Sequence, residues 1–371
     1  MAGAAHSHIR CSIVPPYILV RLARLDDPRF AAAAEAARKS LLRDLPIRDE
    51  RDPEHPSPKR PALRAAGLPA RPAGKIDRSI SDAVGLERLP GRLRVRTEGQ
   101  PAVADVCVNE AYEGLGETHA LFWSKFQRDS IDGRGLPLDA TVHYGRQYDN
   151  AFWDGERMVF GDGDGQVFNR FTISLSVIGH ELTHGVTQFA AKLAYRGQSG
   201  AINESISDVF GSLVEQLAKG QSTAEASWLI GEGLFTDRVD GAALRSMKAP
   251  GTAYNDDVLG KDPQPDSMSG YVDTEDDNGG VHLNSGIPNR AFYLVADALS
   301  GNAWEAPGRI WYDALTEGTL RKTVDFAGFA RATEAAAAKR FGGDSVEHSA
   351  VIDAWATVGL GTSVAVAASP E

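Results

Sequence analysis

Two histidines four residues apart give this sequence its clearest chemical signature. His180 and His184 belong to the run His-Glu-Leu-Thr-His, and residues with this spacing share one face of a helix, so both imidazoles can bind one Zn²⁺. Glu181 follows His180 and can lean over the open position of the metal to take a proton from bound water. The pattern is only moderately specific, because a buried histidine pair without metal has the same spacing.

A second segment, twenty residues after His184, supplies a third ligand. Residues 199–208 indicate the start of another helix, with apolar residues at helical spacing. Glu204 completes a set of two histidines and one glutamate, which is typical of catalytic zinc sites and leaves the fourth position for water. Asp208 and Asn203 are placed to accept the free ring N–H groups of the two histidines. The alternative is an ordinary solvated acidic stripe.

A third segment, residues 276–286, combines paired glycines with a histidine. The glycines let the backbone turn sharply. Asp277, five residues before His282, can hold the imidazole in one orientation, and a cation there would stabilise the oxyanion formed when water attacks a carbonyl. Taken alone, this segment is better explained as a surface turn with an incidental histidine.

Together, the three segments resemble the thermolysin-like zinc metalloendopeptidases in order and spacing over about residues 75 to 361. The resemblance implies an α+β fold of two domains, a mixed β-rich N-terminal domain and a mainly helical C-terminal domain, with zinc in the cleft between them. It implies a neutral endopeptidase in which Glu181 activates a zinc-bound water. By the same resemblance, Tyr195 would help His282 to bind the oxyanion.

The resemblance also assigns substrate contacts. Asn150 and Ala151 match the start of the edge strand that pairs with substrate backbone, and Arg245 matches the arginine that binds the carbonyl of the residue after the scissile bond. The implied preference is for cleavage on the amino side of a bulky apolar residue. Four residues would line the pocket for that side chain, with plain core packing as their alternative role: Phe171, Val177, Ile230 and Leu244.

Calcium is where the sequence departs from the family pattern. Ser176 and Leu229 stand where carboxylates of the double-calcium site are expected, although Glu215 and Glu232 remain. Ca²⁺ takes about six to eight oxygen ligands, so we expect this site to be lost or weakened. The run at residues 161–165 lacks the later bidentate glutamate of a calcium loop and is interpreted as a turn.

The N-terminal arm differs in charge from the rest of the chain. Residues 1–75 hold 14 Lys+Arg against 8 Asp+Glu, whereas the whole chain has a net charge of −11. Pro15-Pro16-Tyr17 resembles the short propeptide motif of the protealysin-like subgroup, and an alanine-rich stretch after it indicates one short helix. We predict a propeptide over residues 1–50 that keeps the enzyme latent, and a proline-rich linker with the maturation region over residues 51–75. The alternative is a disordered basic tail.

The remaining boundaries follow from the same pattern. We expect the N-terminal catalytic domain at residues 76–195, including the zinc helix, the helical domain at 196–361 and a tail at 362–371. As a thiolate, Cys11 could ligate the zinc, but a small buried residue is the simpler interpretation; Cys107 is expected in the core. Helices are predicted at 102–127, 172–190, 289–299, 306–320, 326–341 and 345–358, and strands at 93–96, 141–144 and 157–160.

Location and partners are constrained by what the sequence lacks. The first twenty residues contain no uninterrupted apolar stretch of a secretory signal, and no run approaches the ~18 apolar residues of a membrane span. We therefore expect a cytoplasmic chain that is exported, if at all, by a route that reads no N-terminal signal. The expected partners are peptide and protein substrates and its own propeptide, with no nucleic acid, no membrane and a monomeric state.

Two other functions fit parts of the sequence. A zinc aminopeptidase also pairs this histidine motif with a downstream glutamate, but it needs an acidic anchor for a free amine that we cannot identify. A catalytically silent binding module would keep the fold and lose the reaction. Zinc removal separates the silent module from an enzyme, because a pure binder can keep its partner.

Overall fold

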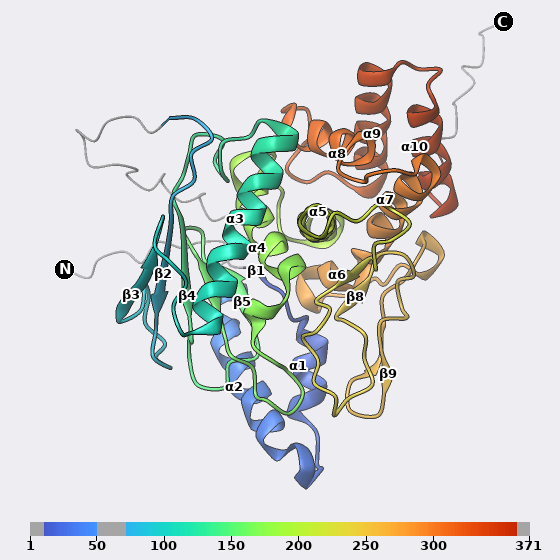
Figure 1. Ribbon diagram of the computed structural model, residues 1–371. Coiled ribbons are helices and arrows are strands. Elements are labelled where there is room, and N and C mark those ends of the chain that lie inside the picture. Colours follow the sequence, from blue (N-terminus) through green and yellow to red (C-terminus); the bar gives the residue numbers. More distant parts are fainter. Residues whose placement is uncertain (1–10, 50–71, 362–371) are drawn as a thin grey trace, which may run out of the picture.

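The structure is a computed structural model that describes residues 11–49 and 72–361, with backbone only for residues 11 and 45–49. A mixed six-stranded sheet lies on one side of the molecule and a group of helices on the other (Figure 1). The sheet order is β1-β5-β6-β4-β2-β3, in which the neighbouring pairs β6–β4 and β4–β2 are parallel and the other described pairs are antiparallel. Its strands are β1 (Cys11–Ser12), β2 (Arg78–Asp82), β3 (Leu93–Thr97), β4 (Leu138–Val142), β5 (Ala151–Trp153) and β6 (Met158–Phe160).

Helices account for most of the remaining elements. The long helices α3, α4 and α5 run between the sheet and the C-terminal helices (Figure 1). This mixed N-terminal part and mostly helical C-terminal part confirm the predicted α+β class. The helices are α1 (Pro16–Ala23), α2 (Ala31–Asp49), α3 (Val106–Phe126), α4 (Leu175–Phe189), α5 (Gly197–Lys219), α6 (Asp277–Asn284), α7 (Gly286–Leu299), α8 (Ala306–Thr316), α9 (Phe326–Phe341) and α10 (Val346–Thr357). Two short ribbons pair β7 (Leu229–Ile230) with β8 (Arg245–Ser246) and β9 (Asn255–Asp256) with β10 (Gly260–Lys261).

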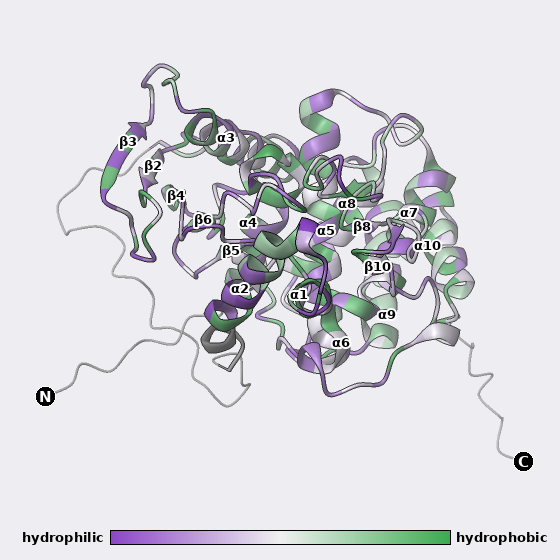
Figure 2. Ribbon diagram, turned by 90° about the horizontal axis from the view of Figure 1, so that it is seen from below, coloured by the Kyte–Doolittle hydropathy of each residue, from purple (hydrophilic) through white to green (hydrophobic). Residues whose placement is uncertain are grey.

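Residues 11–49, here called the pro segment, are more ordered than the sequence indicated. They form strand β1 and the helices α1 and α2, where one short helix was expected. Pro16 opens α1 at a position where its missing N–H costs no hydrogen bond, and the alanines of α2 favour a helix. In both views α1 and α2 lie across the boundary between the sheet and the C-terminal helices (Figures 1 and 2).

Most other element predictions are close, and the differences have local causes. Strand β4 ends at Val142 because His143 has a φ of 54°, which belongs to the left-handed region. Asp105 caps α3 by accepting hydrogen bonds from main-chain N–H groups, so the helix begins later than expected. Residues 171–173 form a separate 3₁₀ turn ahead of α4. No helix in the described ranges has both the length and the apolar character needed to cross a bilayer.

Two glycines let α4 and α5 approach closely. A Cβ atom on Gly211 would lie 2.4 Å from the main-chain oxygen of Ser176, and one on Gly179 would lie 3.0 Å from the Cα of Gly211. Any larger side chain at Gly211 would therefore push the helices apart. This close crossing brings the histidines of α4 next to the acidic residues of α5.

Candidate active site

Three of the predicted metal ligands meet between α4 and α5. The Nε2 atoms of His180 and His184 are 3.0 Å apart. The carboxylate of Glu204 lies 3.4 Å from the first of these nitrogens and 3.6 Å from the second. All three side chains are buried. The donor atoms thus converge on one point from two helices.

The outer nitrogens of the two imidazoles are held by α5. His180 Nδ1 is 2.7 Å from Asp208 Oδ1, and His184 Nδ1 is 2.9 Å from Asn203 Oδ1. Since these oxygens accept hydrogen bonds, each Nδ1 carries a proton and each Nε2 is directed at the space between the two rings. A metal cation there binds both Nε2 lone pairs, and in its absence a proton on His180 keeps the two nitrogens from repelling each other at 3.0 Å. Two imidazoles, one carboxylate and these outer partners fit Zn²⁺.

The electrostatics of the buried site also favour a cation. Burial alone would lower the pKa of His180, but Asp208 and Glu204 outweigh burial and raise it to about 9 in the absence of metal. Burial alone would raise the pKa of Asp208, yet Arg245 and His180 lower it to about 2. Asp208 is therefore a permanent anion that holds Arg245 through both carboxylate oxygens, at 2.8 and 2.9 Å.

Glu181 projects from α4 toward the edge of the sheet. Its Oε2 accepts a hydrogen bond of 3.0 Å from the main-chain N–H of Trp153 in β5, and the side chain is buried. Because it is one residue from His180, the carboxylate is fixed beside the proposed metal ligands. This N–H contact is a positioning interaction that the sequence did not reveal.

The glycine-containing third segment places its histidine next to the same site. Residues 277–280 all have left-handed φ angles, and this turn at the start of α6 brings the carboxylate of Asp277 back onto His282. Asp277 accepts from the main-chain N–H of His282 at 2.9 Å and lies 2.7 Å from its Nδ1. The Nε2 of His282 is 3.4 Å from the hydroxyl of Tyr195, which donates to Glu204.

The pro segment lies along the edge of the sheet that the sequence assigned to substrate. Strand β1 pairs antiparallel with β5. The Ile13 N–H donates to the carbonyl of Ala151 at 3.1 Å, and the Val14 N–H donates to Asn150 Oδ1 at 3.0 Å. Arg245 donates from Nη1 to the carbonyl of Ile13 at 3.2 Å. In this structure β5 is thus no longer an edge strand.

The proposed specificity pocket lies in the core. Its four residues, Phe171, Val177, Ile230 and Leu244, are completely buried and belong to the same apolar cluster as Ile13. The pairing of β7 with β8 sets Ile230 directly opposite Arg245. Ile230 and Arg245 therefore come from one short ribbon, whereas Phe171 lies in the 3₁₀ turn before α4 and Val177 lies on α4.

Several contacts of the site come from residues that carried no signal in the sequence. Asp44 of α2 accepts from Asn150 Nδ2 at 2.9 Å and from the Tyr148 hydroxyl at 2.7 Å. The Ser40 hydroxyl accepts from the main-chain N–H of Asp149 at 3.0 Å. The two residues of each pair are far apart in the sequence, so local spacing does not predict these contacts.

The side chain of Cys11, most of the predicted linker and the predicted tail lie outside the described residues.

The region of the expected double-calcium site contains the positively charged side chain of a lysine. Lys219 at the end of α5 forms a salt bridge of 2.5 Å with Glu215. Ser176 accepts a hydrogen bond of 3.2 Å from the main-chain N–H of Gly231. In the described part of the chain, neither Glu215 nor Glu232 belongs to a group of three candidate metal ligands.

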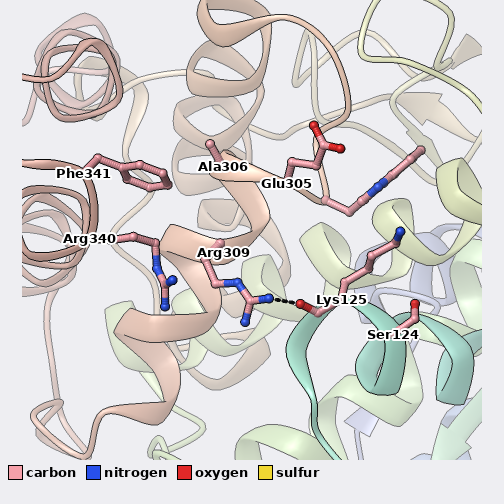
Figure 3. A pocket seen from close by; sticks show the side chains of 8 residues that line it. Ser124, Lys125, Glu305, Ala306, Arg309, Arg340 and Phe341 are labelled. Carbon is pink, nitrogen blue, oxygen red and sulfur yellow. Dashed lines mark hydrogen bonds between the residues drawn. The ribbon is translucent and has the colours of Figure 1, made fainter.

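A separate open pocket of about 540 Å³ lies among α3, α8 and α9 (Figure 3). Its cationic side chains already have protein partners, because Arg309 donates to the carbonyl of Lys125 and Arg340 pairs with Asp313 at 2.5 Å. No residue of the His180 site lines this pocket. The lining residues are Ser124, Lys125, Trp304, Glu305, Ala306, Arg309, Arg340 and Phe341.

Comparisons with known proteins agree with this geometry. Residues 97–188 match the family described as "Thermolysin metallopeptidase, catalytic domain", and residues 191–360 match "Thermolysin metallopeptidase, alpha-helical domain". The chain is 53% identical over 355 residues to an "Extracellular metalloprotease" of Pectobacterium carotovorum subsp. carotovorum, covering 94% of this chain and 96% of that protein. It is 40% identical over 302 residues to an "Extracellular minor metalloprotease" of Serratia marcescens, covering 80% of each.

A solved structure shows the same arrangement over nearly the whole chain. The precursor of protealysin, a metalloproteinase from Serratia proteamaculans, aligns with a TM-score of 0.84 and 49% identity, covering 94% of this chain and 99% of that one. The names of the two extracellular relatives contradict the expectation of a cytoplasmic protein. That expectation was wrong because it depended on the lack of a recognisable N-terminal signal. Sequence, fold and site together show that the chain belongs to the thermolysin family of zinc metallopeptidases, hydrolases that act on peptide bonds.

Proposed function

We propose that this chain is the latent precursor of an extracellular endopeptidase, and that the pro segment inhibits it by binding as a substrate would. The observation that carries this proposal is the contact of Ile13. Its N–H is bound by Ala151 of the expected substrate-pairing strand, and its carbonyl is bound by Arg245, the partner expected for the substrate residue after the scissile bond. Strand addition to an exposed edge is a common way to bind extended peptides.

His180, His184 and Glu204 are the proposed zinc ligands, and zinc bound there would supply the Lewis acid for peptide hydrolysis. Glu181 is the proposed general base. The N–H of Trp153 fixes its carboxylate, which is a base able to take a proton from the attacking water. The same carboxylate then returns the proton to the leaving amine.

His282 and Tyr195 are the proposed donors to the oxyanion that forms on the scissile carbonyl. Their 3.4 Å separation supports a joint role, and Asp277 fixes the imidazole ring. Asp208 and Asn203 are positioning residues, because they act through the two zinc-binding histidines. Asn150 and Ala151 would bind substrate backbone once the pro segment has left.

The proposed preference is for cleavage on the amino side of a bulky apolar residue. Ile13 is such a residue, and it is fully buried in the same apolar cluster as Phe171, Val177, Ile230 and Leu244. A fully buried β-branched side chain at Ile13 is compatible with this preference. Two residues separate β1 from Pro15, and α1 begins at Pro16.

The remaining proposals concern the organisation of the precursor. We infer a propeptide at residues 1–50, a linker at 51–75, a catalytic domain at 76–195, a helical domain at 196–361 and a tail after it. Extracellular location is inferred from the named relatives. The mature enzyme would be a monomer that acts on peptides and proteins.

Calcium is proposed to be dispensable, because the Lys219 ammonium already neutralises Glu215. A chelator that is selective for calcium should leave the melting temperature of the zinc-saturated protein unchanged. A fall of several degrees would show that a calcium site survives.

The proposed function is tested by intact mass against time for the wild-type chain and Glu181→Ala in the presence of zinc. The wild type should lose roughly its first 50 to 75 residues, whereas the variant should stay whole with its zinc retained. Processing of both at the same rate would reject Glu181 as the base. If neither is processed, hydrolysis of a synthetic peptide after limited digestion by a second protease decides between an enzyme and a silent fold.

A further inference from the structure

A second group of potential metal ligands lies outside the site described above. Within residues 11–49 and 72–361, the ligand atoms of Asp105, Cys107 and His143 all lie within 4.8 Å of one another. Asp105 and Cys107 come from the start of α3, and His143 follows the end of β4. The three side chains therefore join the first long helix to the sheet.

The two carboxylate oxygens of Asp105 have different partners. Asp105 Oδ1 accepts from the main-chain N–H groups of Cys107, at 2.9 Å, and Val108. Its Oδ2 lies 2.8 Å from His143 Nε2. Helix capping thus fixes the carboxylate and leaves one oxygen directed at the imidazole.

The imidazole is also fixed from its other side. His143 Nδ1 lies 2.8 Å from Asp162 Oδ1. A carboxylate on the outer nitrogen is the arrangement that orients metal-binding histidines and selects the tautomer with a free Nε2. In addition, His143 has a φ of 54°, a left-handed conformation that is uncommon for residues other than glycine.

We propose that Asp105, Cys107 and His143 form a second divalent-metal site of the zinc class, with Asp162 as the positioning carboxylate. A thiolate, an imidazole and a carboxylate form a ligand set that suits Zn²⁺, Co²⁺ or Cd²⁺ rather than Ca²⁺ or Mg²⁺. The side chains of Asp105 and His143 are 34% and 24% exposed, so water can reach the fourth position. Binding exchanges M²⁺ for two protons, one from His143 Nε2 and one from Cys107 Sγ.

The competing explanation is an imidazolium ion that bridges two aspartates. Asp162 raises the pKa of His143 to about 9, with burial opposing and Asp105 adding to the increase, so such a bridge describes the metal-free protein. The thiol of Cys107, whose pKa is raised to about 11 by burial, takes no part in that bridge. The metal site uses all three groups, because a coordinated thiol loses its proton.

The experiment is a cobalt titration, followed by near-ultraviolet absorption, of full-length protein that has been stripped of metal and reloaded with one equivalent of Zn²⁺. The ligand set of His180, His184 and Glu204 has no sulfur, so a sulfur-to-cobalt charge-transfer band can come only from a cysteine. The chain has two cysteines, and Cys11→Ser is therefore the matched control for Cys107→Ser. We expect a saturable band with one equivalent of Co²⁺ in the wild type and in Cys11→Ser, and no band in Cys107→Ser.

Two further variants make the result independent of any folding defect at Cys107. Asp162→Asn keeps all three ligands but weakens the orientation of His143, and should lower the cobalt affinity about 10- to 100-fold. His143→Gln should bind one zinc ion fewer than the wild type by elemental analysis, with unchanged circular dichroism. The proposal is overturned if the wild type gives no band, or if the band is lost in Cys11→Ser and kept in Cys107→Ser.

Discussion

Arg245 binds Asp208 and the main chain of Ile13 at the same time. Two of its nitrogens lie 2.8 and 2.9 Å from the carboxylate oxygens of Asp208, and a third lies 3.2 Å from the Ile13 carbonyl. Because Asp208 also holds His180, one carboxylate connects the pro segment to the proposed zinc ligands. Occupation of the substrate groove and the orientation of the metal site are thus linked through two side chains.

The first prediction concerns latency. Ile13→Ala removes a fully buried apolar side chain, which typically costs about 2–5 kcal/mol, and should weaken the hold of the pro segment at least about tenfold. The lag before proteolytic activity appears should shorten, as measured by hydrolysis of a fluorogenic peptide. Leu42→Ala is the control, because Leu42 lies on α2 and is 68% exposed. Equal lag times in the two variants would contradict the substrate-like role of Ile13.

The second prediction concerns the oxyanion. Tyr195→Phe removes one hydroxyl donor near His282 and should lower kcat about 10²–10³-fold. KM and zinc content should change little, since Tyr195 is not a proposed ligand. Steady-state kinetics of the matured variant, with elemental analysis of the same sample, measure both effects. A rise in KM at constant kcat would instead assign Tyr195 to substrate binding.

The third prediction concerns pH. The folded-state pKa of Asp208 is about 2, below the value of about 3.9 of an unfolded aspartate, so its stabilisation is present above about pH 4 and is lost as the pH falls toward 2. Asp208→Asn leaves Arg245 without its partner and should cost about 3–5 kcal/mol at neutral pH. The urea concentration at the unfolding midpoint should be lower for Asp208→Asn than for the wild type at neutral pH. This difference should shrink below pH 4.

Asp313→Asn provides the comparison for that experiment. Asp313 pairs with Arg340, whose side chain is 42% exposed, so its loss should cost less than about 1 kcal/mol. Equal destabilisation by the two substitutions would argue against a special role for the Asp208 network.

The fourth prediction concerns helix packing. Gly211→Ala places a Cβ 2.4 Å from the Ser176 carbonyl, and such overpacking typically costs about 1–3 kcal/mol. Since α4 and α5 carry the zinc ligands, the zinc content should fall together with the melting temperature. Gly343→Ala, where a Cβ would meet nothing within 4 Å, should change neither. Full zinc content in Gly211→Ala would show that the spacing of α4 and α5 is not critical for metal binding.

How far the sequence predicts this structure depends on the spacing of the residues involved. The helix at Phe326–Phe341 was predicted at both ends, because its apolar period and its capping aspartate are local. The pair His180 and His184 is local in the same way, because ligands four residues apart on one helix can be read directly from the sequence. Glu204 lies on another helix and was predicted from the pattern of its own segment.

Contacts between distant segments were not predictable in this way. Asp44 and Asn150 are 106 residues apart, and only the packing of α2 against the sheet brings them together. Asp105 and His143 of the second cluster are 38 residues apart, and the local sequence around each of them does not indicate a metal site. The length of α2 was underestimated because its polar residues reach the core rather than solvent, as buried Ser40 and Asp44 show.

In the described part of the chain, strand β1 pairs with β5 through non-covalent contacts, and the next residue, Ile13, is buried in the apolar core. While residues 49 and 72 belong to one chain, this association is unimolecular and does not depend on protein concentration. A cut between residues 49 and 72 would leave each of these contacts in place, but the association of the pro segment with the enzyme would become bimolecular. The cut chain would then remain closed in concentrated solution and open on dilution, so that dispersal, rather than cleavage itself, releases the active enzyme.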